Sequence, residues 1–105
     1  MAQEFIKVAN VDEVSPGNMI SVEFEGRPVL VANVDGELFA IGDECTHAGS
    51  LLSGGYLDGC RVECPTHGAL FDLKTAEAIS PPADEGTPAY CVKVDGQSIL
   101  VGLPE

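Results

Sequence analysis

Two short segments near the middle of the chain each place a cysteine and a histidine a few residues apart. The first runs from Cys45 to His47 and the second from Cys64 to His67, and residues 48–63 separate them. Each segment is short enough for one tight loop to present a thiolate and an imidazole together. The chain has 2 histidines, and both belong to this pattern. A lone cysteine or histidine is more often a packed structural residue, but two mixed pairs predict a metal centre with four protein ligands.

The mixture of residue types within each loop bears on which metal is bound. Two cysteines and two histidines can hold one zinc ion in a closed tetrahedral site. Zinc fingers, however, usually pair cysteine with cysteine and histidine with histidine, and they place a helix under the histidines. Mixed loops suit a two-iron cluster in which one iron takes both cysteines and the other takes both histidines. A structural zinc-binding β domain stays open as an alternative.

An all-cysteine cluster is a further alternative, because the chain has 4 cysteines. The spacing of Cys45, Cys60, Cys64 and Cys91 does not match the short spacing of plant-type ferredoxins, so we do not favour it. We expect structural roles for the two cysteines outside the motifs. Cys91 lies in a β-prone run, where a buried thiol is the usual finding.

Around the two loops the sequence is typical of an antiparallel β protein. Turn residues are frequent, with 12 glycines and 7 prolines, and helix signals are scarce. Asp35-Gly36 and Asp95-Gly96 each separate two β-prone runs, as in a β-hairpin. The runs expected to form strands are residues 19–24, 28–34, 38–41, 61–63, 70–72, 90–94 and 98–101. We therefore expect an all-β fold built on an antiparallel sandwich or small barrel.

The length of 105 residues fits a single domain. The glycine-rich middle, about residues 42–82, contains all the candidate ligands and is expected to form a small cluster-binding lobe. This lobe would be inserted into a β base domain made of about residues 1–41 and 83–105. Residues 80–82, Ser-Pro-Pro, cannot form regular structure and are expected to be a third loop that closes over the metal site.

The charge of the chain excludes two classes of partner. Seventeen acidic residues against 5 basic ones give a formal net charge of −12. Nucleic acids and anionic membrane surfaces are bound through lysine and arginine, so we expect neither. The acidic surface either keeps the protein in solution or steers it toward a positively charged protein partner. The first seven residues do not resemble a signal peptide, and no run is long enough to span a membrane, so we expect a cytoplasmic protein.

The two motifs resemble the Rieske iron–sulfur signature, and the resemblance spans essentially the whole chain. It is closest to the Rieske-type ferredoxins that serve bacterial aromatic-ring-hydroxylating dioxygenases. Supporting matches are residues 34–40 (Val-Asp-Gly-Glu-Leu-Phe-Ala) and 55–59 (Gly-Tyr-Leu-Asp-Gly). The resemblance implies the Rieske fold with one [2Fe–2S] cluster per chain. It also implies that one iron is bound by Cys45 and Cys64, and the other by His47 and His67.

The resemblance further implies a function as a one-electron carrier, between a flavin-dependent ferredoxin reductase and a terminal oxygenase. Rieske oxygenases add a mononuclear iron held by two histidines and a carboxylate. This chain has no histidine left after the cluster and no Gly-x-Gly-x-x-Gly motif, so we expect that it is not itself an enzyme. The main alternative is the small Rieske subunit of an assimilatory nitrite reductase. No feature indicates an obligate oligomer, and we expect a monomer.

Respiratory Rieske proteins differ from this chain at positions close to the ligands. They have a disulfide beside the cluster where this chain has Ser50 and Thr66. They also have serine and tyrosine hydroxyls that donate to the cluster sulfurs where this chain has Ala69 and Phe71. Fewer donors leave negative charge on sulfur less stabilised. We therefore predict a reduction potential near the low end of the Rieske range, about −150 mV.

We expect partner proteins to dock where the imidazole edges of His47 and His67 lie near the surface. The apolar residues expected to form this docking patch are Ala48, Leu51, Leu52, Pro81 and Pro82. The acidic residues expected to orient the partner include Asp43, Glu44 and Asp84.

Overall fold

The computed structural model describes residues 5–44, 51–65, 68–79, 86–87 and 89–103. Within these residues the strands are β1 (Phe5–Asn10), β2 (Met19–Phe24), β3 (Arg27–Val34), β4 (Glu37–Gly42), β5 (Tyr56–Asp58), β6 (Arg61–Glu63), β7 (Leu70–Asp72), β8 (Ala89–Asp95) and β9 (Ser98–Gly102). Two short 3-10 helices, η1 (Val11–Glu13) and η2 (Leu52–Gly54), complete the described elements. Neither helix is long and apolar enough to cross a membrane. The predicted all-β fold is confirmed.

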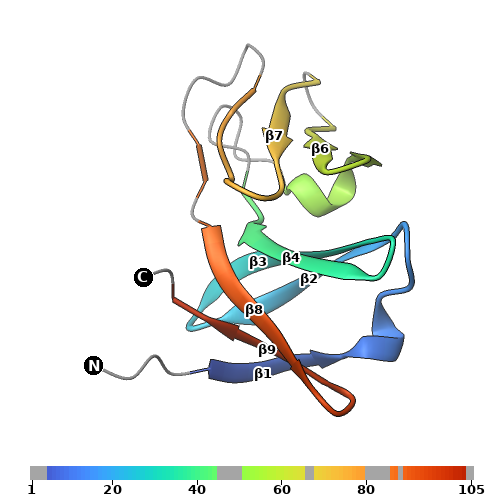
Figure 1. The fold of residues 1–105 in the computed structure, drawn as a ribbon. Helices are drawn as coiled ribbons and strands as arrows, with labels where there is room; N and C mark the ends of the chain where they lie inside the picture. Colours follow the sequence, from blue (N-terminus) through green and yellow to red (C-terminus); the bar gives the residue numbers. More distant parts are fainter. Residues whose placement is uncertain (1–4, 45–50, 66–67, 80–85, 88, 104–105) are drawn as a thin grey trace.

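Six strands form one antiparallel sheet in the order β1-β9-β8-β4-β3-β2. This sheet curls until its two edge strands, β1 and β2, come into contact, so that it has the form of a small barrel (Figure 1). The other three strands form a small antiparallel sheet in the order β5-β6-β7, which lies beyond one end of the barrel in Figure 1. The chain passes from the barrel to the small sheet after β4 and returns before β8. The division into a base domain and a lobe at residues 42 and 82 stays a prediction.

Tight turns that contain glycine join the neighbouring strands of the barrel. Between β3 and β4, Asp35 and Gly36 have φ angles of 53° and 94°, as a type I′ turn requires. Between β8 and β9, Gly96 has a φ of 63°. The Asp-Gly dipeptides predict both of these hairpins correctly. A third hairpin, between β2 and β3, turns at Glu25 and Gly26 with φ angles of 51° and 80°; this turn was not predicted.

Strand β3 is buried on both faces and separates two hydrophobic cores. Successive strand residues point to opposite faces, so Val29 and Val31 pack inside the barrel with residues of β1, β2, β4 and β9. Leu30 and Ala32 face the other way and pack with residues of η2, β6 and β7. We call this latter group the second core; it also includes Cys64. A continuous apolar run in β3 is what a strand between two cores requires, and the second core fixes the small sheet against the barrel.

Candidate metal centre

The second predicted ligand loop connects β6 to β7. Cys64 follows β6 directly, and its side chain is 1% exposed. Its backbone N–H donates to the carbonyl oxygen of Ala69 at 2.7 Å, and its carbonyl oxygen accepts from the N–H of Gly68 at 3.1 Å. Gly68 has a φ of 74°, a conformation that costs free energy for residues with a side chain. The backbone therefore closes this loop and holds Cys64 within the second core.

The first predicted ligand loop, residues 45–50, begins after β4 and ends before η2. Glu44 and Leu51, which flank it, form an antiparallel bridge. One residue further out, the N–H of Leu52 donates to the carbonyl oxygen of Asp43 at 2.7 Å. The carboxylate of Asp43 accepts hydrogen bonds from the N–H and the hydroxyl of Ser53, at 2.6 and 2.7 Å. The base of this loop is thus closed by main-chain pairing and by one buried carboxylate.

The bases of the two loops lie against each other. A Cβ added to Gly55, just after η2, would overlap the carbonyl oxygen of Glu63 and lie 3.1 Å from Cδ of Pro65. Glu63 and Pro65 flank Cys64, so the chain that leaves the first loop packs on the start of the second loop. Leu52 and Cys64 also share the second core. The need for glycine at position 55 is not visible in the sequence, where it is one of many glycines.

Of the four predicted ligands, the structure describes Cys64. Cys45, His47 and His67 lie outside the described residues, so the assignment of the four residues as ligands stays a prediction. The described surroundings fit a bound cluster, because they bring together two closed loop bases and keep one thiol away from water. Within the described part of the chain, no group of three or more histidine, cysteine, aspartate or glutamate side chains is arranged to hold a metal ion.

The two positions at which this chain lacks a hydroxyl are buried in the second core together with Cys64. Ala69 and Phe71 are both 0% exposed. Neither side chain carries a polar hydrogen, so neither can donate a hydrogen bond to a sulfur atom of the centre. This arrangement supports the predicted low potential, which stays a prediction.

Two residues that were expected at the docking surface are buried instead. Leu52 is 0% exposed because η2 turns its side chain into the second core. Asp43 is also 0% exposed, with its carboxylate bound to Ser53. The predictions for Leu52 and Asp43 are therefore wrong. Leu51, 47% exposed, and Glu44 lie at the surface. The other residues assigned to docking lie outside the described residues; these are Ala48, Pro81, Pro82 and Asp84.

The two cysteines outside the motifs lie on different sheets. Cys60 lies in the turn between β5 and β6, and Cys91 lies on β8 opposite Gly102. Both are half-buried, and neither forms a disulfide with another described cysteine. The expected burial of the Cys91 thiol is thus only partial.

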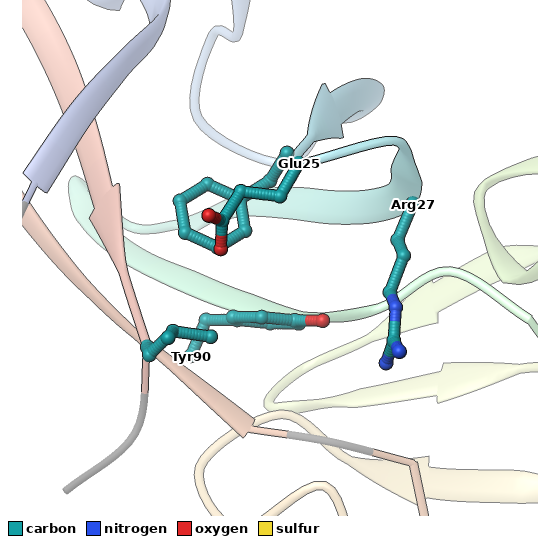
Figure 2. Close-up of a pocket in the computed structure, with 5 residues that line it drawn as sticks. Glu25, Arg27 and Tyr90 are labelled. Atoms are coloured by element: carbon teal, nitrogen blue, oxygen red, sulfur yellow. The ribbon is translucent and has the colours of Figure 1, made fainter.

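A cavity of about 340 Å³ lies between the β2–β3 turn and the start of β8 (Figure 2). Tyr90 and Arg27 both line it, and the ring of Tyr90 extends toward the side on which Arg27 lies (Figure 2). The rings of Phe24 and Tyr90 meet edge to face, with their centroids 5.5 Å apart. The residues that line the cavity are Phe24, Glu25, Arg27, Tyr90 and Leu103. This lining contains no thiol or imidazole, so the cavity cannot supply the ligands of the predicted centre.

Comparisons with known proteins place the chain in one family. Residues 4–94 match the family model of the Rieske [2Fe-2S] domain. The biphenyl dioxygenase ferredoxin subunit of Pseudomonas sp. (strain KKS102) is 44% identical over 98 residues, which are 92% of this chain and 90% of that protein. The ferredoxin of carbazole 1,9a-dioxygenase from Nocardioides aromaticivorans IC177 superposes with a TM-score of 0.90, at 31% identity, over 95% of this chain and 98% of that one.

A further solved structure shows such a ferredoxin with its partner. It is a complex of reduced oxygenase and oxidized ferredoxin in carbazole 1,9a-dioxygenase. The match has a TM-score of 0.88 at 32% identity and covers 96% of this chain and 94% of that one. The family model matches most of the chain and the sequence relative is 44% identical over 92% of it, so this chain belongs to the Rieske [2Fe–2S] domain family.

Proposed function

We propose that this protein is the ferredoxin component of an aromatic-ring dioxygenase system and carries single electrons to a terminal oxygenase. The observation that carries the proposal is the 44% identity to a dioxygenase ferredoxin subunit over 90% of that subunit. The likeness therefore extends over nearly the whole length of an electron carrier. The chain takes part in oxygenation as an electron donor and is not itself the enzyme.

Its own residues would hold the redox centre in place. A Rieske-type [2Fe–2S] cluster, when bound, takes up and releases one electron. We assign one iron to the thiolates of Cys45 and Cys64, and the other to the imidazoles of His47 and His67. The closed loop bases would keep these four side chains at fixed positions, and the second core excludes water from Cys64.

The proposed partners follow from the same likeness. A similar ferredoxin is seen in complex with its oxygenase, so we expect this chain to dock on a terminal oxygenase. Leu51, exposed beside the first loop, offers an apolar contact, and the net charge of −12 favours a positively charged docking surface. We further propose a flavin-dependent reductase as electron donor and a monomeric protein. We place it in the cytoplasm, a compartment that keeps thiols reduced.

Metal analysis and EPR spectroscopy test the proposal first. Protein purified under anaerobic conditions should contain iron and sulfide. After reduction with dithionite, it should give a rhombic EPR signal with a mean g-value below that of all-cysteine clusters. Zinc in place of iron would contradict the proposed cluster.

Stopped-flow mixing then tests the role as a carrier. The reduced protein should be reoxidised rapidly by the oxidised terminal oxygenase of a biphenyl-type dioxygenase. The rate should fall as salt is added, because salt screens the acidic surface. Transfer to a sirohaem nitrite reductase, with none to the oxygenase, would instead favour the alternative of a nitrite reductase subunit.

A further inference from the structure

Among the described residues, Asp43 is the charged side chain that is fully buried, at 0% exposed. Its neighbour Glu44 is exposed. Burial of a carboxylate costs free energy unless hydrogen bonds replace the water that it loses. A general need for negative surface charge therefore explains Glu44 but does not explain Asp43.

Ser53 replaces the water around the Asp43 carboxylate. The backbone N–H of Ser53 donates to Oδ1 at 2.6 Å, and its hydroxyl donates to Oδ2 at 2.7 Å. Hydrogen bonds to an ionised carboxylate are roughly twice as strong as those between neutral groups. Within the described residues, no buried side-chain nitrogen or oxygen is left without a partner. Asp43 and Ser53 are thus a satisfied polar pair beside an apolar core.

This pair connects the two ends of the loop that carries Cys45. Asp43 precedes the loop and Ser53 follows it. The main chain of Asp43 adds two further hydrogen bonds: its N–H donates to the carbonyl oxygen of Pro28 at 3.1 Å, and its carbonyl oxygen accepts from Leu52 at 2.7 Å. Asp43 therefore fastens the base of the first ligand loop both to its own far end and to β3 of the barrel.

We propose that Asp43 is a positioning residue for the cluster, which fixes the base of the loop carrying Cys45 and His47 and lowers the reduction potential through its buried negative charge. The proposal rests on the ligation that the proposed function assigns to those two residues. Asp43 is two residues before the proposed ligand Cys45, and two residues of extended chain span at most about 7 Å between Cα atoms. A charge in poorly solvated surroundings opposes an incoming electron more strongly than an exposed charge, which water and salt screen.

Redox titration of the holo-protein tests this with a matched pair of variants. Asp43→Asn and Glu44→Gln each remove one carboxylate charge at nearly constant side-chain size, the first from a buried position and the second from an exposed one. We expect Asp43→Asn to favour reduction by about tenfold, a positive shift of about 59 mV for a one-electron couple. Glu44→Gln should shift the potential by less than a third of that. A shift for Asp43→Asn no larger than that for Glu44→Gln overturns the proposal.

If Asp43→Asn does not retain the cluster, Ser53→Ala tests the proposed role of Asp43 instead. This variant keeps the charge but removes the hydroxyl hydrogen bond, so the potential should fall and the EPR g-values should shift. A wild-type potential with wild-type g-values in Ser53→Ala overturns the proposal. Wild-type protein without iron contradicts the ligation on which both proposals rest. Wild-type protein that holds the cluster but does not reduce an oxygenase contradicts the proposed function alone.

Discussion

The two ligand loops are closed at their bases by different means. The first loop combines main-chain pairing with a side chain, because the carboxylate of Asp43 also binds Ser53 across its base. The second loop depends on the backbone, through the hydrogen bonds of Cys64 with Gly68 and Ala69. A carboxylate thus helps to close the first loop, whereas the second loop depends on glycine residues, which have no side chain.

This difference predicts where each loop is sensitive to substitution. The first loop should respond to changes in charge and hydrogen bonding, with effects that extend to the reduction potential. The second loop should respond to added volume or to a change in backbone preference, with effects on stability and cluster retention. Substitutions of the glycines beside the second loop therefore test the difference between the two loops most strongly.

Gly55→Ala should have the largest effect. An added Cβ would overlap the carbonyl oxygen of Glu63 and crowd Pro65, so the backbone on either side of Cys64 must move. Overpacking of this kind costs about 1–3 kcal/mol, and we expect the upper end together with loss of most of the bound iron. Urea unfolding and iron content measure both effects. Gly54→Ala is the matched control, because its nearest contact would be at 3.9 Å; equal behaviour of the two variants would contradict this account of the second loop.

Asp43→Ala should have the next largest effect, through the first loop. The substitution removes both hydrogen bonds to Ser53, and a hydrogen bond to a charged group contributes about 1.5–3 kcal/mol. Ser53 is only half-buried, so water can replace part of what is lost, and we expect about 2 kcal/mol. Ser53→Ala should lose less, since the backbone N–H still donates. Urea unfolding of both variants checks this order; a larger loss in Ser53→Ala would show that the hydroxyl has another role.

Gly68→Ala should have a smaller effect that comes from the backbone alone. The φ of 74° at Gly68 favours glycine, while an added Cβ would come no closer than 3.9 Å to Oε2 of Glu63. The cost is therefore conformational, about 1–2 kcal/mol. Because asparagine adopts this conformation more readily than alanine, Gly68→Asn should be the milder variant. Thermal unfolding followed by circular dichroism compares the two, and equal midpoints would argue against a conformational cause.

Local signals in the sequence predict much of this fold. The strands at residues 61–63 and 70–72 have the predicted bounds, and the Asp-Gly hairpins form as expected. β1 is not predicted, because its pairing depends on β9, at the other end of the chain. β5 is missed as well; its three residues are too few to show a period.

Some features of the candidate centre can likewise be predicted from local sequence patterns, whereas others depend on contacts between residues that are distant in the sequence. The Cys/His motifs are local patterns, so the sequence identifies them directly. The burial of Asp43 and Leu52 is decided by contacts with β3 and with the small sheet. The sequence suggests a surface role for both residues, since an acidic residue and a leucine beside a loop are compatible with exposure. The requirement for glycine at position 55 likewise depends on the carbonyl oxygen of Glu63, which no local pattern indicates.

Ala69→Ser should have the smallest effect, and it sharpens the comparison by giving the second loop a polar side chain. Ala69 is buried with Cys64 in the second core. Because water does not reach this position, a serine hydroxyl there should donate its hydrogen bond to a cluster sulfur. One hydrogen bond contributes about 1 kcal/mol, equivalent to a rise in potential of about 40 mV from the 59 mV per tenfold change of a one-electron couple. Ala69→Val, which adds volume without a donor, is the control for crowding. An equal rise in both variants, measured by redox titration, would show that the hydroxyl does not set the potential; a rise in Ala69→Ser alone would show that the second loop, like the first, can tune the centre once it carries a polar group.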